Sequence, residues 1–380
     1  MEENKNKILN VPTLRFNEFT TNWQSTTLKN VCEYRKIRRT TEKKNYVSTE
    51  NIMQNFQGVE RFISAEYISG DGFNKNDILM GNIRPYLKKV CFADFDGVCN
   101  ADVLVFNSKT INPKFLYYVL ANDNFINYVM SSVKGSKMPR GDKNFIMQYP
   151  LSLPSETEQL KISDFIGCLT KRIQVQNKII SDLKVLKKEL CNKVFSKGSA
   201  VRLGGFIEEV TTRNKLNSCE NVLSVSNKMG FIKQSEQFED RTVASENKSN
   251  YKVVTEGCFA YNPARINVGS IALLSTYKIG IISPMYVCFK AKSALDSEYL
   301  NFYYQSDFFY KELQKKLEGS VRQCLTYENM SEILIPYVGI EEQKAIAATL
   351  NKFATLIANE EKYLKSLQKQ KSYFLNAMFI

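Results

Sequence analysis

The sequence predicts a duplicated α/β (α+β) fold, in which two globular regions are separated by two long helices packed as an antiparallel coiled coil. Three observations predict it. The stretch EQLKISDFIGCL (158–169) returns as EQKAIAATLNKF (342–353), each stretch opens a long segment with helical apolar spacing, and similar β-rich segments precede both in the same order. Internal repetition of this kind indicates the architecture before any single motif does.

Apolar residues in the two long segments fall at matching positions when Gln159 is laid over Gln343 without a gap. They recur at steps of three and four residues, which is the spacing of one narrow helical seam. A segment of about 37 residues would form a helix about 55 Å long at ~1.5 Å per residue. Because neither helix can bury its stripe alone, we expect the two seams to pack on each other; the predicted seam residues are Ile162, Ile166, Leu169, Ile173, Ile180, Leu183, Leu190, Ile346, Leu350, Phe353, Ile357, Leu364, Leu367 and Phe374.

Polar residues interrupt both seams at equivalent places, first at Gln176 and Glu360 and then at Lys187 and Lys371. Polar residues in a seam cost stability but can fix its register. Alternatively, these positions tilt out toward solvent. Each helix is expected to begin after a strand-like exit that ends in proline, and Ser155 is the expected N-cap of the first helix.

The repetition continues upstream of both helices, more weakly. A strand, a polar loop with Asn and Arg, and a second strand are predicted in DILMGNIRPYLKKVCF (77–92) and in GCFAYNPARINVGSIAL (257–273). Aromatic amphipathic helices are expected over 112–130 and 296–314, and we interpret their aromatic residues as core because they recur at helical spacing. The repetition predicts four regions: 1–153 with an N-terminal extension over 1–22, a central helix over 154–198, a second globular region over 199–336, and a C-terminal helix over 337–380.

Composition limits the possible functions. The 380 residues include 52 Lys and Arg against 39 Asp and Glu, and the formal charge of +13 suits either a nucleic-acid partner or a basic surface kept for solubility. The sequence has no histidine, no Gly-rich phosphate loop, no adenine-methylation motif and no nuclease motif, so it lacks the features of an enzyme. Its nine cysteines form no CxxC pair, so no metal site is predicted. No apolar run reaches the ~20 residues of a membrane span, and we expect a cytoplasmic protein with reduced thiols.

The polar loops between predicted strands are the candidate DNA contacts. Asn suits adenine and Arg suits guanine in the major groove, whereas Lys and Tyr can hold phosphates. Both halves carry such a loop at the same place, and turn-rich stretches follow downstream. The densest charge run, KNVCEYRKIRRTTEKK (29–44), is more simply interpreted as a solvated face. The candidate DNA-binding residues are Asn82, Arg84, Tyr86, Lys88, Lys89, Lys137, Arg140, Asn227, Lys228, Asn262, Arg265, Asn267, Arg322 and Gln323.

Three features, in their order along the chain, resemble the specificity subunit of type I restriction-modification systems. They are the opening VPTLRFNEFTTNWQSTTLKNV (11–31), the paired EQLKI and EQKAI helix starts, and the phrase VLSVSNKMGFIKQSE (222–236). The resemblance covers essentially the whole chain. It implies two target recognition domains, each reading one half of a bipartite asymmetric DNA site, with the two helices as a spacer between them. No catalytic residue carries over, because that family places none on this subunit.

The resemblance also implies partners. The chain would bind double-stranded DNA, and its helices would dock two methyltransferase subunits that use S-adenosylmethionine to methylate adenine at N6. Two restriction subunits, which use ATP and Mg²⁺ to translocate DNA, could join the assembly, while this chain would bind no cofactor itself. The competing interpretations are a stand-alone sequence-specific or architectural DNA-binding protein, an enzyme in its own right, and a scaffold that binds no DNA.

Overall fold

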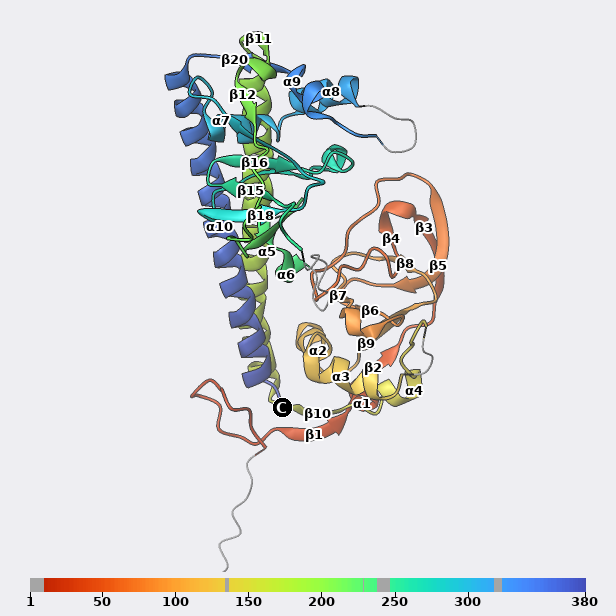
Figure 1. Ribbon diagram of the computed structural model, residues 1–380. Coiled ribbons are helices and arrows are strands. Elements are labelled where there is room, and N and C mark those ends of the chain that lie inside the picture. The colour runs from red at the N-terminus through yellow and green to blue at the C-terminus, as the bar shows by residue number, and fades with distance from the viewer. Residues whose placement is uncertain (1–9, 134–136, 228, 238–246, 318–322) are drawn as a thin grey trace, which may run out of the picture. The chain divides into compact units, whose positions relative to one another are not determined.

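The computed structural model describes residues 10–133, 137–227, 229–237, 247–317 and 323–380 (Figure 1). The chain divides into two compact units, and each of the two long helices contributes one part to each unit. Unit 1 holds the described residues up to Gln176 together with Tyr363–Ile380, and unit 2 holds those of Asn177–Lys362. We call the part of unit 1 before its long helix the first domain, and the corresponding part of unit 2 the second domain.

The first domain is built on two small sheets and a ribbon. One sheet is antiparallel throughout, in the order β2 (Cys32–Tyr34), β9 (Val103–Ser108), β6 (Ile78–Gly81) and β7 (Val90–Phe92). In the other sheet the last two strands are parallel, and the order is β3 (Arg38–Glu42), β5 (Tyr67–Phe73), β8 (Gly97–Cys99) and β4 (Tyr46–Val47). The ribbon pairs β1 (Gln24–Thr27) with β10 (Pro150–Leu153), the strand that leads into the first long helix.

Helices cover one side of the antiparallel sheet of the first domain (Figure 1). They are α1 (Leu28–Val31), α2 (Pro113–Leu120), α3 (Asp123–Ser131) and α4 (Lys143–Ile146), with 3₁₀ turns η1 (Lys43–Asn45) and η2 (Pro85–Leu87). The continuous helix expected over 112–130 is therefore two helices. The chain breaks at Asn122, whose side chain caps α3 by accepting the Asn124 N–H and also donates to the Leu375 carbonyl. The expected aromatic core is confirmed, since Phe115 and Phe125 are fully buried.

The second domain repeats this plan. Its antiparallel sheet has the order β12 (Ile207–Glu209), β19 (Val287–Ala291), β16 (Cys258–Tyr261) and β17 (Ile271–Leu273). Its mixed sheet has the order β14 (Gly230–Lys233), β13 (Val222–Ser226), β18 (Ile279–Ile282) and β15 (Lys252–Thr255). Its ribbon pairs β11 (Ser199–Arg202) with β20 (Leu334–Tyr337), which leads into the second long helix.

The helices of the second domain pack against its antiparallel sheet around a second aromatic core. They are α7 (Ser297–Tyr303), α8 (Asp307–Lys316) and α9 (Tyr327–Ser331), whereas α6 (Gln234–Gln237) packs against β13 and β14 of the mixed sheet. The domain also has 3₁₀ turns η3 (Leu203–Gly205) and η4 (Ile266–Val268). The helix expected over 296–314 is again two helices, because Ser306 caps α8 by accepting the Phe309 N–H. Tyr299, Tyr303 and Phe309 are buried as expected, whereas Tyr310 is exposed.

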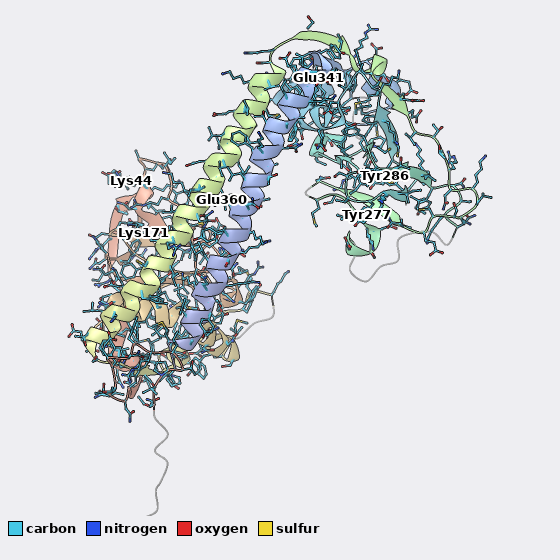
Figure 2. All side chains as sticks on the ribbon, turned by 90° about the vertical axis from the view of Figure 1, so that its left-hand side faces the viewer. Lys44, Lys171, Tyr277, Tyr286, Glu341 and Glu360 are labelled. Atoms are coloured by element: carbon cyan, nitrogen blue, oxygen red, sulfur yellow. The ribbon has the colours of Figure 1, made fainter. Side chains whose placement is uncertain are left out.

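The two long helices are α5 (Glu156–Phe195, 40 residues) and α10 (Ile340–Ala377, 38 residues). At ~1.5 Å per residue each is about 60 Å long. Ser155 caps α5 as predicted, since its hydroxyl accepts the Glu158 N–H. Figure 2 marks Lys171 on α5 and Glu360 on α10.

The parts of α5 and α10 that share a unit run antiparallel. In unit 1, the rings of Phe165 and Phe374 meet edge to face at 4.9 Å, and Arg172 donates to the Tyr363 hydroxyl at 2.7 Å. In unit 2, Cys191 and Phe195 near the end of α5 share a core with Leu350 near the start of α10. In both units, residue numbers that rise along one helix fall along the other, which is the predicted antiparallel packing.

The structure places all fourteen predicted seam residues at buried or half-buried positions. The interruptions of the seam also stay inside: Gln176 is buried, and Glu360, Lys187 and Lys371 are half-buried. Burial lowers the pKa of Lys187, and it lowers the pKa of Lys371 to about 8. These positions are therefore not tilted fully out to solvent. Across the described residues, no helix is long and apolar enough to cross a membrane.

Candidate nucleic-acid interface

The repeated EQ pair ties each long helix to the domain before it. Gln159 and Gln343 are both buried. The Gln159 side chain accepts the N–H of Asn112, the N-cap of α2, at 2.9 Å and donates to the Pro154 carbonyl. The Gln343 side chain accepts the N–H of Asp296, the N-cap of α7, at 2.8 Å. It also donates to the Ala294 and Val338 carbonyls. The repeat in the sequence therefore preserves a buried joint between helix and domain.

The glutamate before each glutamine behaves differently in the two copies. Glu158 is fully buried and receives both Arg15 N–H groups, Nε at 2.7 Å and Nη2 at 2.8 Å, together with the Trp23 indole at 3.3 Å. Its counterpart Glu342 is exposed. The first copy thus anchors the N-terminal segment of the chain. That segment also reaches the end of α10, where the Leu14 N–H donates to the Ala377 carbonyl.

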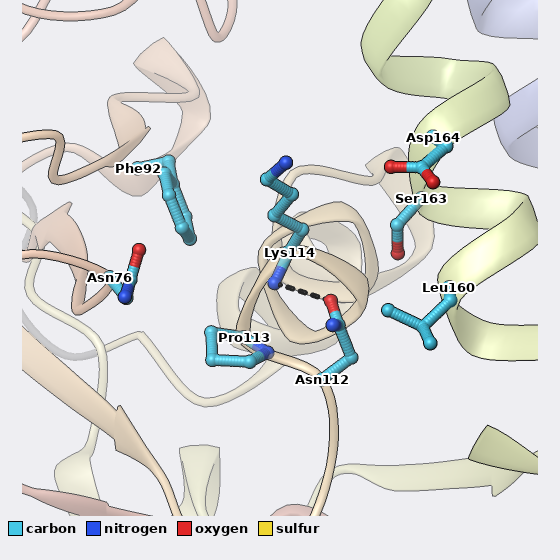
Figure 3. Close-up of a pocket in the computed structure, with 8 residues that line it drawn as sticks. All are labelled: Asn76, Phe92, Asn112, Pro113, Lys114, Leu160, Ser163 and Asp164. Atoms are coloured by element: carbon cyan, nitrogen blue, oxygen red, sulfur yellow. Dashed lines mark hydrogen bonds between the residues drawn. The ribbon is translucent and has the colours of Figure 1, made fainter. Parts of the chain in front are cut away.

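A small hollow of about 190 Å³ lies beside the first joint (Figure 3). Asn112 and Lys114 at the start of α2 line one side, and Leu160 and Asp164 of α5 line the other. The Asn112 side chain is already used as a cap, since it accepts the Lys114 N–H at 3.0 Å. The hollow is a by-product of the joint between helix and domain.

In the first domain, the loop 82–89 follows β6 and lies against residues 139–141. The buried Asn82 holds the two segments together, because its amide donates to the Gly141 carbonyl at 3.2 Å and accepts the Gly141 N–H at 3.1 Å. The Arg84 N–H donates to the Pro139 carbonyl at 2.8 Å. Asn82 is therefore occupied within the domain, and its role is to position the loop.

The side chains that this loop pair presents to solvent are cationic and aromatic. Arg84, Tyr86, Lys137 and Arg140 are exposed. Arg84 has a left-handed backbone with φ of 51°, which starts the 3₁₀ turn η2. The Arg140 guanidinium donates to the Asp102 carboxylate at 3.1 Å and 3.2 Å. This exposed ion pair holds the orientation of the guanidinium.

Two further candidates in this loop are partly committed to contacts inside the first domain. Lys88 forms an ion pair with Asp123 at 2.8 Å. Lys89 donates to the Thr49 carbonyl. Both side chains are half-buried, and their contacts help to hold the loop 82–89 in place.

The second domain places its loop 262–270 in the same position, after β16. The buried Asn262 accepts the Ala264 N–H at 3.1 Å and shapes the turn. The Leu325 N–H donates to the Pro263 carbonyl at 3.2 Å, so the downstream segment again meets the loop. Gly269 ends the turn η4 with φ of 87°, a backbone conformation that favours glycine.

The exposed candidates of the second domain are Asn227, Arg265, Asn267 and Gln323. Asn227 comes from the β13–β14 hairpin and donates to the Val268 carbonyl at 2.8 Å, so the hairpin and the loop 262–270 form one surface. Lys228 and Arg322 lie outside the described residues. Sequence reasoning found both loops but not the inward direction of their asparagines, Asn82 and Asn262.

Several buried thiols of the two units have raised pKa values. Burial raises the pKa of Cys32, Cys99 and Cys288 to about 12, and that of Cys191 and Cys258 to about 11. These side chains stay protonated at neutral pH and serve as small apolar core residues. Across the described residues, no group of three or more His, Cys, Asp or Glu could hold a metal ion.

Comparison with known proteins assigns both domains to one protein family. The family model described as type I restriction modification DNA specificity domain matches twice, over residues 20–185 and 188–369. The chain belongs to this family. As a specificity subunit it carries DNA recognition domains and is not catalytic. The two matches also agree with the duplication predicted from the sequence, and the predicted fold class is confirmed.

Two curated specificity subunits are similar to the chain in sequence. The type I restriction enzyme MjaVIII specificity subunit of Methanocaldococcus jannaschii is 24% identical over 374 residues, which cover 86% of this chain and 87% of that protein. The type I restriction enzyme EcoDI specificity subunit of Escherichia coli is 32% identical over 90 residues, which cover 24% of this chain and 20% of that protein.

Two solved structures share the fold of this specificity subunit. The S subunit of a type I restriction-modification system from M. genitalium has a TM-score of 0.60 and 14% identity, and the match covers 97% of this chain and 99% of that one. A chain from a structure concerning complex assembly and conformational transition of the type I R-M system has a TM-score of 0.58 and 17% identity, with coverage of 95% and 98%.

Proposed function

We propose that each domain of this specificity subunit reads one half of a bipartite asymmetric DNA site, and that α5 and α10 set the gap between the two halves. The observation that carries the proposal is the pair of loops 82–89 and 262–270. They follow equivalent strands and meet equivalent downstream segments. Their exposed side chains nevertheless differ, with Arg84 and Tyr86 in one loop and Arg265 and Asn267 in the other. Equal scaffolds with unequal contacts suit two different half-sites.

Base contacts in the first half-site are assigned to Arg84 and Arg140, because guanidinium groups can donate two hydrogen bonds to guanine. Lys137 and Tyr86 supply phosphate contacts, and Asn82, Lys88 and Lys89 position the loop. In the second half-site, Arg265, Asn267, Asn227 and Gln323 make the contacts, and Asn262 positions the loop. The assignment follows exposure, since a buried and already bonded amide has no free edge to offer a base.

The two long helices also dock the methyltransferase subunits in this proposal. A set of exposed apolar side chains on α5 supports it: Leu160, Val175, Ile179, Val185 and Leu186. At 100° per residue these side chains fall within about 120° of helix surface, and Leu186 lies beside the seam residues Leu183 and Leu190. On α10, Leu356, Tyr363 and Tyr373 are the exposed apolar residues among those described. Exposed apolar surfaces of this kind mark protein–protein contacts.

The chemistry then belongs to the partners. Two methyltransferase subunits would bind S-adenosylmethionine and methylate one adenine at N6 in each half-site. Two restriction subunits would use ATP and Mg²⁺ to move DNA. The specificity subunit contributes the choice of site, and it holds none of these cofactors itself.

Genome-wide mapping of N6-methyladenine tests the proposal, after co-expression of this chain with its methyltransferase subunit. We expect a single bipartite motif with a fixed gap, present only when this chain is present. Methylation that does not depend on the chain would contradict the proposal. Absence of methylation despite a stable complex would instead favour a stand-alone DNA-binding protein.

A further inference from the structure

The mixed sheet of the first domain ends in a long polar ribbon. β3 pairs with β5 over five residues, and β3 is the edge strand of that sheet. Directly opposed residues share a face, so Arg38 with Asp71 and Thr40 with Ser69 lie on one face of the ribbon. We call this the outer face; it also carries Tyr67, which is 73% exposed. The opposite face carries Arg39 and Gly70.

The outer face is exposed and carries a guanidinium that has no partner among the described residues. Arg38, Thr40 and Ser69 are all exposed. Thr40 and Ser69 share a hydrogen bond of 2.7 Å across the two strands. Within the described part of the chain, the Arg38 guanidinium has no hydrogen-bond or ion-pair partner. Exposed hydroxyl groups and an unpaired guanidinium are able to form hydrogen bonds with base edges in the major groove.

Two glycines of β5 let neighbouring groups approach the strand closely. A Cβ on Gly70 would overlap the Cys99 carbonyl of β8, and a Cβ on Gly72 would meet the Arg39 side chain and the Ile37 carbonyl. Arg39 lies on the opposite face, where it is exposed and donates to Asn74 at 2.6 Å. Neighbouring arginines of one strand thus have different roles, since only Arg38 points from the outer face.

The ribbon and the loop 82–89 belong to the same domain and are linked through the mixed sheet. That loop contacts the segment after β4, where the Phe56 N–H donates to the Lys88 carbonyl at 3.0 Å. β4 and β3 are the two edges of one four-stranded sheet, and three strand spacings of ~4.8 Å separate them by about 14 Å. The major groove is ~12 Å wide and admits a two-stranded ribbon. A ribbon of the size of β3–β5 therefore fits the major groove.

Among the described residues of the second domain, no such ribbon is present. At the same edge, β15 makes a single bridge, between Arg213 and Lys252, in place of a five-residue ladder. Its sheet is extended at the other edge instead, where β14 pairs with β13. The mixed sheets of the two domains therefore differ in the strand added at the edge, β3 in the first and β14 in the second.

We infer that the β3–β5 ribbon is a second base-reading element of the first domain, with Arg38, Thr40 and Ser69 entering the major groove of its half-site. The inference rests on the proposed function of the two domains and extends it to residues outside the loops. It also assigns the charge run around Arg38 to recognition, where the sequence favoured a solvated face.

The test is N6-methyladenine mapping with Arg38→Ala and with the double variant Thr40→Ala/Ser69→Ala, each co-expressed with the methyltransferase subunit. We expect both variants to relax one or two base positions of the same half-site by about tenfold or more, since a good base contact contributes ~1–3 kcal/mol of discrimination. The other half-site and the gap should stay unchanged. Arg39→Ala is the matched control, because it removes the same charge from the opposite face and should leave every base preference intact.

Two outcomes would overturn the inference. One is a uniform loss of methylation at all sites, which would make Arg38 a phosphate contact. The other is an unchanged motif in both outer-face variants. Circular dichroism and thermal melting of the variants establish that they fold. If the unaltered chain directs no bipartite motif at all, the proposed function itself fails, and that result is visible before any variant is made.

Discussion

The first and second domains share an inner framework and differ at their margins. Both have the same antiparallel sheet order, three equivalent strands in the mixed sheet, and the same buried glutamine joint to the following helix. They differ in the extended edge, which is β3 in the first domain and β14 in the second. They differ also in the exposed residues of the loops 82–89 and 262–270.

This division suits two domains that share a framework and, as proposed, read different half-sites. Strands that are buried on both faces and joined to a long helix tolerate little change, because each substitution there alters packing. Edges and loops are solvated, so they can change residue type and length at small cost to stability. The comparison therefore predicts that changes to the framework act on folding or spacing, whereas changes at the margins act on one half-site.

The largest effect should come from lengthening the helices. Insertion of one heptad after Gln176 in α5 and one before Tyr363 in α10 keeps the seam in register and adds about 10 Å. The methylated motif should keep both half-sites and gain about three base pairs of gap, at ~3.4 Å per pair. Methylation at the original motif should disappear, as mapping in the host genome would show.

A heptad in α5 alone is the control for this experiment. It places the two seams out of step and should abolish methylation at every gap length. An unchanged gap in the doubly lengthened chain, or altered half-sites, would show that the helices do not set the spacing.

The buried glutamate of the first joint should be the next most sensitive feature. Glu158→Ala leaves Arg15 and the Trp23 indole without their acceptor, and removal of one partner of a buried pair costs about 3 kcal/mol. The equivalent Glu342→Ala removes an exposed carboxylate and should cost less than about 0.5 kcal/mol. Urea denaturation, with hydrogen exchange over 10–23 as the local probe, measures both. Equal costs would mean that Glu158 does not anchor the N-terminal segment.

The same contrast marks the limit of prediction from sequence. The repeat, the seam periodicity and the cap at Ser155 are local patterns, so they could be found in the sequence alone. The burial of Glu158 depends on Arg15, 143 residues away in sequence, and the inward turn of Asn82 depends on Gly141, 59 residues away. The β3–β5 ribbon could not be predicted from the charge run 29–44 for a similar reason. Its outer face exists only once β5 has paired with it, and residues 43–66 separate the two strands.

Loop variants should separate the two domains most directly. Arg84→Ala should relax one half-site by about 1–3 kcal/mol, and Arg265→Ala should relax only the other half-site by a similar amount. Competition binding of the assembled complex to duplexes mutated in one half at a time provides the readout. Equal losses on all duplexes would reduce both arginines to phosphate contacts. If both variants relaxed the same half-site, the assignment of one domain to each half-site would be wrong.

The smallest effect concerns the equivalent lysines of the two seams. Lys187 donates to the Gln305 side chain at 3.2 Å and lies over the Phe302 ring. Lys371 has no such partner among the described residues, and burial lowers its pKa to about 8 from an ordinary value of 10.5. A buried ammonium without a partner is destabilising, so Lys371→Met should stabilise the protein by about 1–2 kcal/mol at pH 7. Lys187→Met should give less, because it also removes a hydrogen bond.

The pH dependence of the Lys371→Met gain follows from that lowered pKa. Between pH 8 and pH 10.5 the unfolded chain binds a proton at Lys371 that the folded chain has released, so the folded state gains stability relative to the unfolded state as pH rises. Below pH 8 the burial penalty is complete, and near pH 10.5 it has been relieved. Urea denaturation of Lys371→Met and of the unaltered chain at pH 7 and pH 10 should therefore give a difference that shrinks toward the higher pH. A difference that stays constant would attribute the gain to apolar packing of the methionine, and the two lysines would then be equivalent seam residues after all.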